Sequence, residues 1–175
     1  TADFDNGKLI KLDKRIARFN KRLARCKQFS KNWLKVKTKL QQAHLNFVNY
    51  RYDFIKKLVH EINQAYDSVT LENLRMGFVK QNKRLAAAAK RKPYYLLKEA
   101  LINKFNQYGK KIYLVSMSYP STQTCYQCGY VKRGEEKIER ERTYHCNHCG
   151  HVNDRDENAA KNLWACKEVT LATIE

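Results

Sequence analysis

Four cysteines in two short pairs are the residues of this sequence best suited to chemistry. Cys125 and Cys128 form one C-x-x-C pair, Cys146 and Cys149 form a second, and seventeen residues separate the two pairs. This spacing lets two turns present four thiolates to one tetrahedral Zn²⁺ ion. We therefore expect one structural zinc ion in a zinc ribbon.

Other uses of the cysteines fit less well. Gly129 and Gly150 follow the pairs, and glycine tolerates the positive φ of a turn whose amides point at the sulfurs. Two disulfides or a redox site are the alternatives, but Cys26 and Cys166 add two further cysteines and nothing in the sequence resembles a secretory leader. Three histidines near the second pair could substitute as ligands: His145, His148 and His151. Cysteine usage of this kind favours a reducing compartment, so we expect a cytoplasmic protein, nucleoid-associated if the source is bacterial.

Carboxylates lie close to the second cysteine pair and at the end of a predicted strand. Asp154 and Asp156 follow Cys149, and Glu72 ends a run that alternates with period two. Two or three convergent carboxylates can bind a pair of Mg²⁺ ions for phosphodiester cleavage, because hard cations prefer oxygen ligands. The alternative for Glu72 is an ordinary surface residue on an edge strand.

The charge of the chain indicates a polyanionic partner. Lys and Arg number 35 against 17 Asp and Glu, which gives a formal net charge of +18. Nucleic acid is the default partner, and an anionic membrane is the weaker alternative because no apolar run approaches the roughly 20 residues that span a bilayer. The candidate nucleic-acid contacts are Lys14, Arg15, Arg18, Lys21, Arg22, Arg25, Lys132 and Arg133. For the last two, a solvated loop is an equally good interpretation.

The N-terminal third is predicted to form a hairpin and then two helices. The turn signal Asp5-Asn6-Gly7 predicts a β-hairpin over residues 1–10. Apolar residues at helical spacing follow over 12–26, and a second helix capped by Ser30 runs through Ile62, so that residues 11–65 form an antiparallel helical hairpin. Trp33 is expected to be a core anchor rather than a base-stacking platform.

The rest of the chain alternates between strand and helix. We expect a strand over 67–74, a basic connection over 77–93, a helix over 97–108 closed by Gly109, a strand over 111–117, and a helix over 157–167 that packs through Ala160, Leu163 and Trp164. This order favours an α/β fold of the RNase H-like class. The predicted divisions are a nuclease-like core with the helical hairpin at 1–118, the zinc ribbon at 119–153, and a last motif with the C-terminal helix at 154–175.

Three stretches carry a resemblance to a known family. The residues of 66–74, 119–129 and 144–163 resemble the C-terminal half of transposon-encoded TnpB (OrfB) proteins, which are RNA-guided DNA endonucleases related to type V CRISPR effectors. The resemblance implies a split RuvC nuclease domain, with Glu72 and Asp156 as its second and third catalytic carboxylates and as ligands of two Mg²⁺ ions. It also implies that the ribbon is a target-nucleic-acid-binding element, and that guide RNA and target DNA are partners.

The sequence departs from that family at its N-terminal end. The family's first catalytic Asp stands in a Gly-Ile-Asp-x-Gly strand, and neither Asp3 nor Asp5 has that context. We therefore expect an N-terminally truncated RuvC fold that is a poor nuclease alone, with the missing N-terminal part of the same protein as a further partner. The alternatives are a nuclease-inactive RNA-guided DNA-binding protein, a transposase-associated DNA-binding accessory, and a structural zinc module.

Overall fold

The computed structural model describes residues 6–74, 94–139, 141–166 and 169–172, which belong to two compact units. The helical unit holds α1 (Asn6–Leu23), α2 (Lys31–Ala65) and most of α4 (Tyr94–Gln107). The second unit holds β1 (Ser68–Glu72), β2 (Lys111–Val115), the 3₁₀ turn η2 (Gly134–Glu136), β3 (Thr143–His145), β4 (Val152–Asp154), α5 (Arg155–Ala165) and β5 (Val169–Leu171). The predicted basic connection over 77–93 lies outside the described residues.

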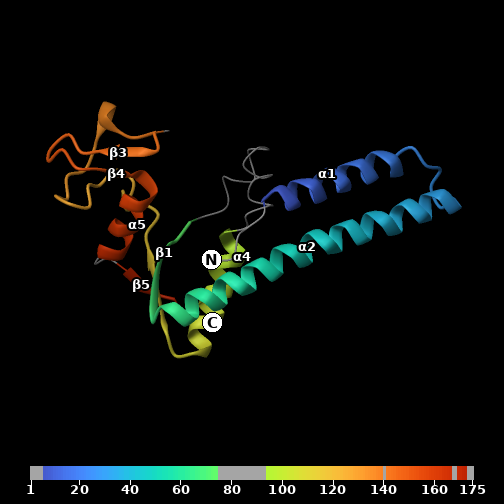
Figure 1. Cartoon of the computed structure of the whole chain (residues 1–175), viewed down its shortest axis with the longest axis horizontal. Helices are drawn as coiled ribbons and strands as arrows, with labels where there is room; N and C mark the ends of the chain where they lie inside the picture. The colour runs from blue at the N-terminus through green and yellow to red at the C-terminus, as the bar shows by residue number, and fades with distance from the viewer. Residues whose placement is uncertain (1–5, 75–93, 140, 167–168, 173–175) are drawn as a thin grey trace. The chain divides into compact units, whose positions relative to one another are not determined.

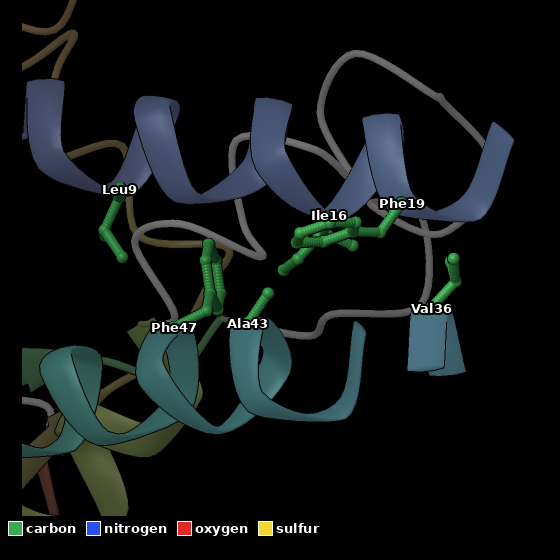
Figure 2. Packing of buried hydrophobic residues seen from close by; sticks show 6 residues of the cluster. All are labelled: Leu9, Ile16, Phe19, Val36, Ala43 and Phe47. Atoms are coloured by element: carbon green, nitrogen blue, oxygen red, sulfur yellow. The ribbon is translucent and has the colours of Figure 1, made fainter. Parts of the chain in front are cut away.

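Helices α1 and α2 lie side by side and antiparallel, as the spacing of their apolar residues predicts (Figure 1). Leu9, Ile16 and Phe19 of α1 point towards α2, which supplies the other half of a buried cluster (Figure 2). The α2 members of the cluster are Val36, Ala43 and Phe47. Burial of each Leu, Ile, Val or Phe side chain of this cluster contributes about 1.5–3 kcal/mol. The cluster therefore holds the two helices together.

The β-hairpin predicted over residues 1–10 is wrong where the structure can test it. Asn6 to Ile10 are the first residues of α1, and Leu9 is fully buried. Leu9 extends the helical stripe of Ile16 and Phe19 by two turns, and packing of that stripe outweighs the local turn signal at Asn6-Gly7. Residues 1–5, with Asp3 and Asp5, lie outside the described residues.

The start of α2 is confirmed, but the role predicted for Trp33 is not. The Trp33 amide donates to Ser30 Oγ at 3.2 Å, which is the predicted cap. Trp33 itself is only half-buried and is no member of the core cluster, so the expectation of a core anchor is wrong. The fully buried positions of α2 are Val36, Ala43, Phe47, Ile55, Val59 and Asn63.

A three-stranded sheet organises the second unit. β1 and β2 pair in parallel from Ser68↔Lys111 to Glu72↔Val115, and β5 pairs antiparallel with β2. Strand β2 is central and buries Ile112 and Val115, whereas β1 ends at Glu72. The predicted strands and the mixed α/β class are confirmed, and the sheet places Glu72 at the end of a parallel strand.

Candidate metal centre and carboxylate pair

Each cysteine pair lies in a tight turn of the same design. The Cys125 amide donates to the Tyr130 carbonyl at 2.8 Å, and the Cys146 amide donates to the His151 carbonyl at 2.8 Å. Gly129 and Gly150 close these turns with φ angles of 75° and 72°, which a residue with a Cβ adopts only with strain. The sequence therefore folds into two equivalent cysteine turns, as predicted from the glycines.

The two turns bring the four sulfurs together. The sulfurs of Cys125, Cys128, Cys146 and Cys149 all lie within 4.8 Å of one another. Cys125 Sγ is 3.7 Å from Cys149 Sγ, and Cys128 Sγ is 3.6 Å from Cys146 Sγ. A tetrahedron with Zn–S bonds of about 2.3 Å has sulfurs about 3.8 Å apart, whereas a disulfide needs about 2.05 Å. The cluster thus indicates a structural zinc site and excludes the disulfide alternative for these pairs.

Within the described part of the chain, these cysteines are the only group of three or more side chains placed to share a metal ion. His148 stacks on the Tyr130 ring with centroids 5.6 Å apart instead of joining the cluster. The possibility of histidine substitution is therefore not needed to complete the site, because four thiolates fill a tetrahedral coordination shell.

The thiols of the cluster show why a cation is needed. Although burial opposes its charged form, amides of Cys149 and His148 lower the pKa of Cys146 to about 6. Despite a hydrogen bond from the Tyr130 amide, burial and the neighbouring thiols raise the pKa of Cys128 to about 12. Without metal, burial and the repulsion between neighbouring thiolates both oppose full ionisation of the cluster. A divalent cation removes that repulsion.

Short β-pairings flank the two cysteine turns. β3 pairs with β4 around the second cysteine pair, and Thr124 bridges Val131 around the first. Each turn thus supplies its own short β-pairing, and fully buried Tyr144 on β3 packs with Cys125 and Cys146. The zinc ribbon is centred on the metal site and this ring.

Lys132 and Arg133 have different environments in the ribbon. Lys132 is only 7% exposed, and its Nζ donates to Asn147 Oδ1 at 3.3 Å. Its ammonium also lies 5.5 Å from the centre of the Tyr144 ring. Lys132 is therefore poorly placed to reach a phosphate, whereas Arg133 is exposed. Nucleic-acid contact by either residue stays a prediction.

Two buried asparagines tie α5 to the first cysteine turn. Asn158, which is 0% exposed, accepts a hydrogen bond from the Tyr126 amide at 3.0 Å and donates to the Thr124 carbonyl at 2.7 Å. Asn162 Nδ2 donates to the carbonyls of Ser121 at 2.8 Å and Thr124 at 2.6 Å. Sequence reasoning missed both residues. Their i, i+4 spacing on one helix face was the available signal.

The first turn of α5 separates the roles of Asp154 and Asp156. Asp154 Oδ1 accepts hydrogen bonds from the amides of Asp156 at 2.8 Å and Glu157 at 3.0 Å, so it is the helix cap. The Asp156 side chain is exposed, and its Oδ1 accepts from Arg155 Nε at 3.1 Å. Asp154 therefore caps the helix, and Asp156 keeps oxygen atoms available at the surface.

Glu72 and Asp156 stand on neighbouring elements of the same unit. Glu72 is the last residue of β1, Asp156 lies in the first turn of α5, and α5 packs against β1. Glu72 is half-buried, and this burial raises the pKa of its carboxyl group. A buried carboxylate at a strand end is a common environment for a functional group, because its charge is costly without a cation. The metal-binding role of this pair stays a prediction.

Five of the six candidate contacts in this region lie at exposed positions of α1, and the sixth, Arg25, lies two residues after its end. Lys14, Arg18 and Arg22 follow at one-turn spacing on the side of α1 away from Ile16 and Phe19, and they line an open surface groove. Lys21 and Arg25 line the same groove, and Arg15 lines an adjoining one. Such a row matches the charge of a phosphate backbone, although the contacts themselves stay predictions.

Two family models match most of this chain. The model of the Cas12f1-like TNB domain matches residues 94–163, and the OrfB_IS605 model, described as "Probable transposase", matches residues 2–83. A "TnpB-like protein L79" of Acanthamoeba polyphaga mimivirus is 33% identical over 77% of this chain and 26% of its own length. The "Putative RNA-guided DNA endonuclease" of Streptomyces pristinaespiralis is 30% identical over 86% of this chain and 37% of its own length.

A third relative and one solved structure extend the comparison. The "Putative RNA-guided DNA endonuclease InsQ" of Escherichia coli K12 is 28% identical over 94% of this chain. The chain therefore spans between 26% and 44% of the length of these three relatives. A chain in the cryo-EM structure of a Cas12f1-sgRNA-target DNA complex matches 86% of this chain with a TM-score of 0.55 and 21% identity, which shows a shared fold. Among the described residues, no helix is long and apolar enough to cross a membrane.

Proposed function

Because the chain belongs to the TnpB/OrfB family of IS605-type elements, we propose that it is part of an RNA-guided, Mg²⁺-dependent DNA endonuclease. Three features support this function: the zinc ribbon, the carboxylates at the sheet end, and the basic face of α1. The proposed fold of the second unit is the RuvC variant of the RNase H-like class, of which β1, β2, β5 and α5 form a part.

The packing of α5 against β1 is the observation that carries the proposal, because it joins the elements of Glu72 and Asp156 in one unit. These carboxylates would hold two Mg²⁺ ions together with a third carboxylate. Bound there, the ions supply charge for the attacking and leaving oxygens of a phosphodiester. The carboxylate oxygens of Asp156 and Glu72 are the type of ligand that this hard cation prefers.

The chain's own residues orient the carboxylates. Asp154 fixes the first turn of α5 by capping it, which sets the direction of the Asp156 side chain. Arg155 holds one oxygen of Asp156 through its Nε. The hydrogen bonds of Asn158 and Asn162 then hold this helix on the ribbon, so that the zinc site supports the position of Asp156.

Phosphate contacts and base pairing would divide the work of recognition. The exposed cations of α1 bind backbone phosphates without regard to sequence, and the guide RNA selects the target by pairing. The printed names of the relatives and of the structural neighbour support guide RNA and target DNA as the partners. The ribbon would contribute Arg133 to these contacts.

Cleavage by the natural polypeptide that contains this chain tests the proposal. Loaded with zinc and its guide RNA, that protein should cut a matched DNA in Mg²⁺, and Glu72→Gln or Asp156→Asn should slow the cut at least about 100-fold. Glu135→Gln, an exposed carboxylate of η2, is the matched control and should cut normally.

Two outcomes would redirect the proposal. Unchanged cleavage in both carboxylate variants would remove Glu72 and Asp156 from the site. Guide-dependent DNA binding without any cleavage by the parent protein would favour the nuclease-inactive binder. This alternative is consistent with the described residues, in which no third carboxylate or histidine lies with Glu72 and Asp156 to share a metal ion.

A further inference from the structure

The tip of the helical hairpin, residues 25–37, presents aromatic rings outside the core. Phe29 is 72% exposed, and its ring centroid lies 5.3 Å from that of the half-buried Trp33 at an interplanar angle of 53°. Lys37 Nζ stands 4.6 Å from the centre of the Trp33 ring. A large ring that stays exposed forgoes the stabilising free energy of burial. A connection between helices that serves only the fold is therefore expected to carry smaller or polar residues here.

The backbone at Phe29, whose ring is exposed, has a strained conformation. Its φ is 63°, and it is the one non-glycine residue with positive φ among those described. Glycine adopts this angle freely, whereas a bulky side chain does so at a conformational cost. The Ser30 amide donates to the Lys27 carbonyl at 3.1 Å, which fixes the turn. Strain of this kind tends to be retained where a side chain has a function.

The charge around the tip selects the class of partner. From Lys14 to Tyr52 the sequence contains no acidic residue. Five cations of the tip are exposed: Arg25, Lys27, Lys31, Lys35 and Lys37. They follow the basic row of α1, and Arg25 lines the same groove as Lys14, Arg18 and Arg22. An apolar protein partner would make no favourable contact with so many lysines. A single-stranded nucleic acid, which has phosphates and exposed bases, could contact both the cations and the aromatic rings of the tip.

We propose that Phe29 and Trp33 form a stacking platform for an unpaired base of single-stranded nucleic acid, with the surrounding lysines on its phosphates. Bases stack on aromatic side chains regardless of sequence, and single strands are the form in which base faces are accessible. Lys37 adds a cation on the Trp33 ring that can also meet a phosphate. The inference rests on the nucleic-acid binding proposed above, but not on the carboxylates or on cleavage.

Fluorescence of Trp33 gives a direct test on the zinc-loaded chain. Trp164→Phe leaves Trp33 as the sole tryptophan, because the chain has two. A single-stranded oligonucleotide should quench this emission on binding, since a stacked base contacts the ring. Adding Phe29→Gly should weaken the single-strand affinity about tenfold, or about 1.4 kcal/mol, while the melting temperature stays equal or rises because glycine relieves the strained φ.

A neighbouring variant and two other ligands make the result specific. Leu34→Ala removes a 51% exposed side chain of the same tip and should bind as the parent does. Duplex DNA and heparin, which offer phosphates or sulfates without open bases, should bind the Phe29→Gly variant as tightly as the parent.

Each remaining outcome has a defined meaning. Equal single-strand affinity for parent and Phe29→Gly would overturn the platform and leave the proposed nuclease intact. An equal loss for all three ligands would show a charge effect and would also overturn it. If the parent binds no nucleic acid at all, the platform fails together with the nucleic-acid binding on which it rests.

Discussion

At the scale of single residues, zinc binding requires thiolates, and the environment of the cluster opposes ionisation of all four thiols in the absence of metal. Backbone amides lower the pKa of Cys146 against the effect of its burial, whereas burial and then the neighbouring thiols raise the pKa of Cys128. Zn²⁺ binding must therefore displace protons from the cluster. Its apparent affinity should rise with pH, since thiols bind protons in competition with metal at low pH.

Zinc content after serine substitution tests this account. Cys146→Ser removes the most acidic thiol and one of four ligands, so we expect the zinc content to fall from about one ion per chain towards zero after dialysis. Cys166→Ser, outside the cluster, is the control and should retain zinc. The measurement is colorimetric zinc release at pH 8 and pH 6, with weaker retention at pH 6 for the parent. Equal zinc in both variants would contradict the four-thiolate site.

Glu72 gives a second prediction at this scale. Burial raises the pKa of its carboxyl group, so the folded protein holds the proton at pH values where the unfolded chain, with a pKa of about 4.3, has lost it. The stability due to protonated Glu72 is present below the unfolded pKa and is lost as pH rises through the folded pKa. Glu72→Gln, which is never charged, should therefore raise the melting temperature at pH 7 without added Mg²⁺, and change it little at pH 4.

Thermal melting of the two proteins at both pH values checks the sign. Glu135→Gln, an exposed carboxylate, should show no such difference. A lower melting temperature of Glu72→Gln at pH 7 would mean that folding favours the charged form of Glu72, and the linkage argument would then be wrong.

At the scale of elements, the start of α5 separates capping from catalysis. Asp154→Ala removes the acceptor for two amides and should destabilise the second unit by about 0.5–2 kcal/mol. Asp154→Ser restores a capping oxygen and should recover most of that loss in urea unfolding. Because the cap carries no proposed metal contact, Asp154→Ser should also leave cleavage near the parent rate. Loss of cleavage with a normal cap would instead make Asp154 a metal ligand.

The attachment of α5 to the ribbon gives another test. Asn158→Ala leaves the Thr124 carbonyl and the Tyr126 amide without this partner in a buried place, which should cost about 1–3 kcal/mol. Urea unfolding followed by Trp164 fluorescence in a Trp33→Phe background reports on the second unit alone. Asn46→Ala, an exposed asparagine of α2, should be neutral. Equal midpoints for both variants would contradict a structural role for Asn158.

The contrast between α1 and α5 shows what apolar patterns can and cannot predict. The stripe of Ile16 and Phe19 was predictable because α1 packs against apolar side chains of another helix. The predicted packing face of α5 is wrong at Ala160 and Trp164, which are exposed, whereas Leu163 is half-buried. The fully buried residues are Asn158, Ala159 and Asn162. This helix packs against backbone carbonyls, which need donors rather than apolar atoms, so a search for apolar spacing selects the wrong side.

At the scale of the whole molecule, local spacing predicted the cysteine cluster, whereas the burial of single side chains could not be predicted because it depends on tertiary packing. The cysteine set was predictable because C-x-x-C turns form locally. The place of Glu72 at the end of a strand was predictable because strand alternation is a short-range signal, while its role in a site stays a prediction. Lys132 could not be told from Arg133 by sequence, since its burial depends on Asn147 and Tyr144 from the other side of the ribbon. Likewise, the strained angle of Phe29 follows from the helix connection and has no sequence signal.

The net charge of +18 leads to a prediction about salt. If Lys14, Arg18 and Arg22 each contact a phosphate, replacing all three by Gln should reduce the slope of log affinity against log salt by about 2, because each contact on a single strand contributes about 0.7. Lys57→Gln with Lys161→Gln is the matched control, since these ammoniums already lie 2.8 Å from Asp53 and 2.6 Å from Glu157. The slopes of both variants are measured by oligonucleotide titrations at salt concentrations from about 50 to about 200 mM. A parent-like slope in the triple variant would place the phosphates elsewhere on the chain, whereas a reduced slope with normal Trp33 quenching would show that the row on α1 and the stacking platform act separately.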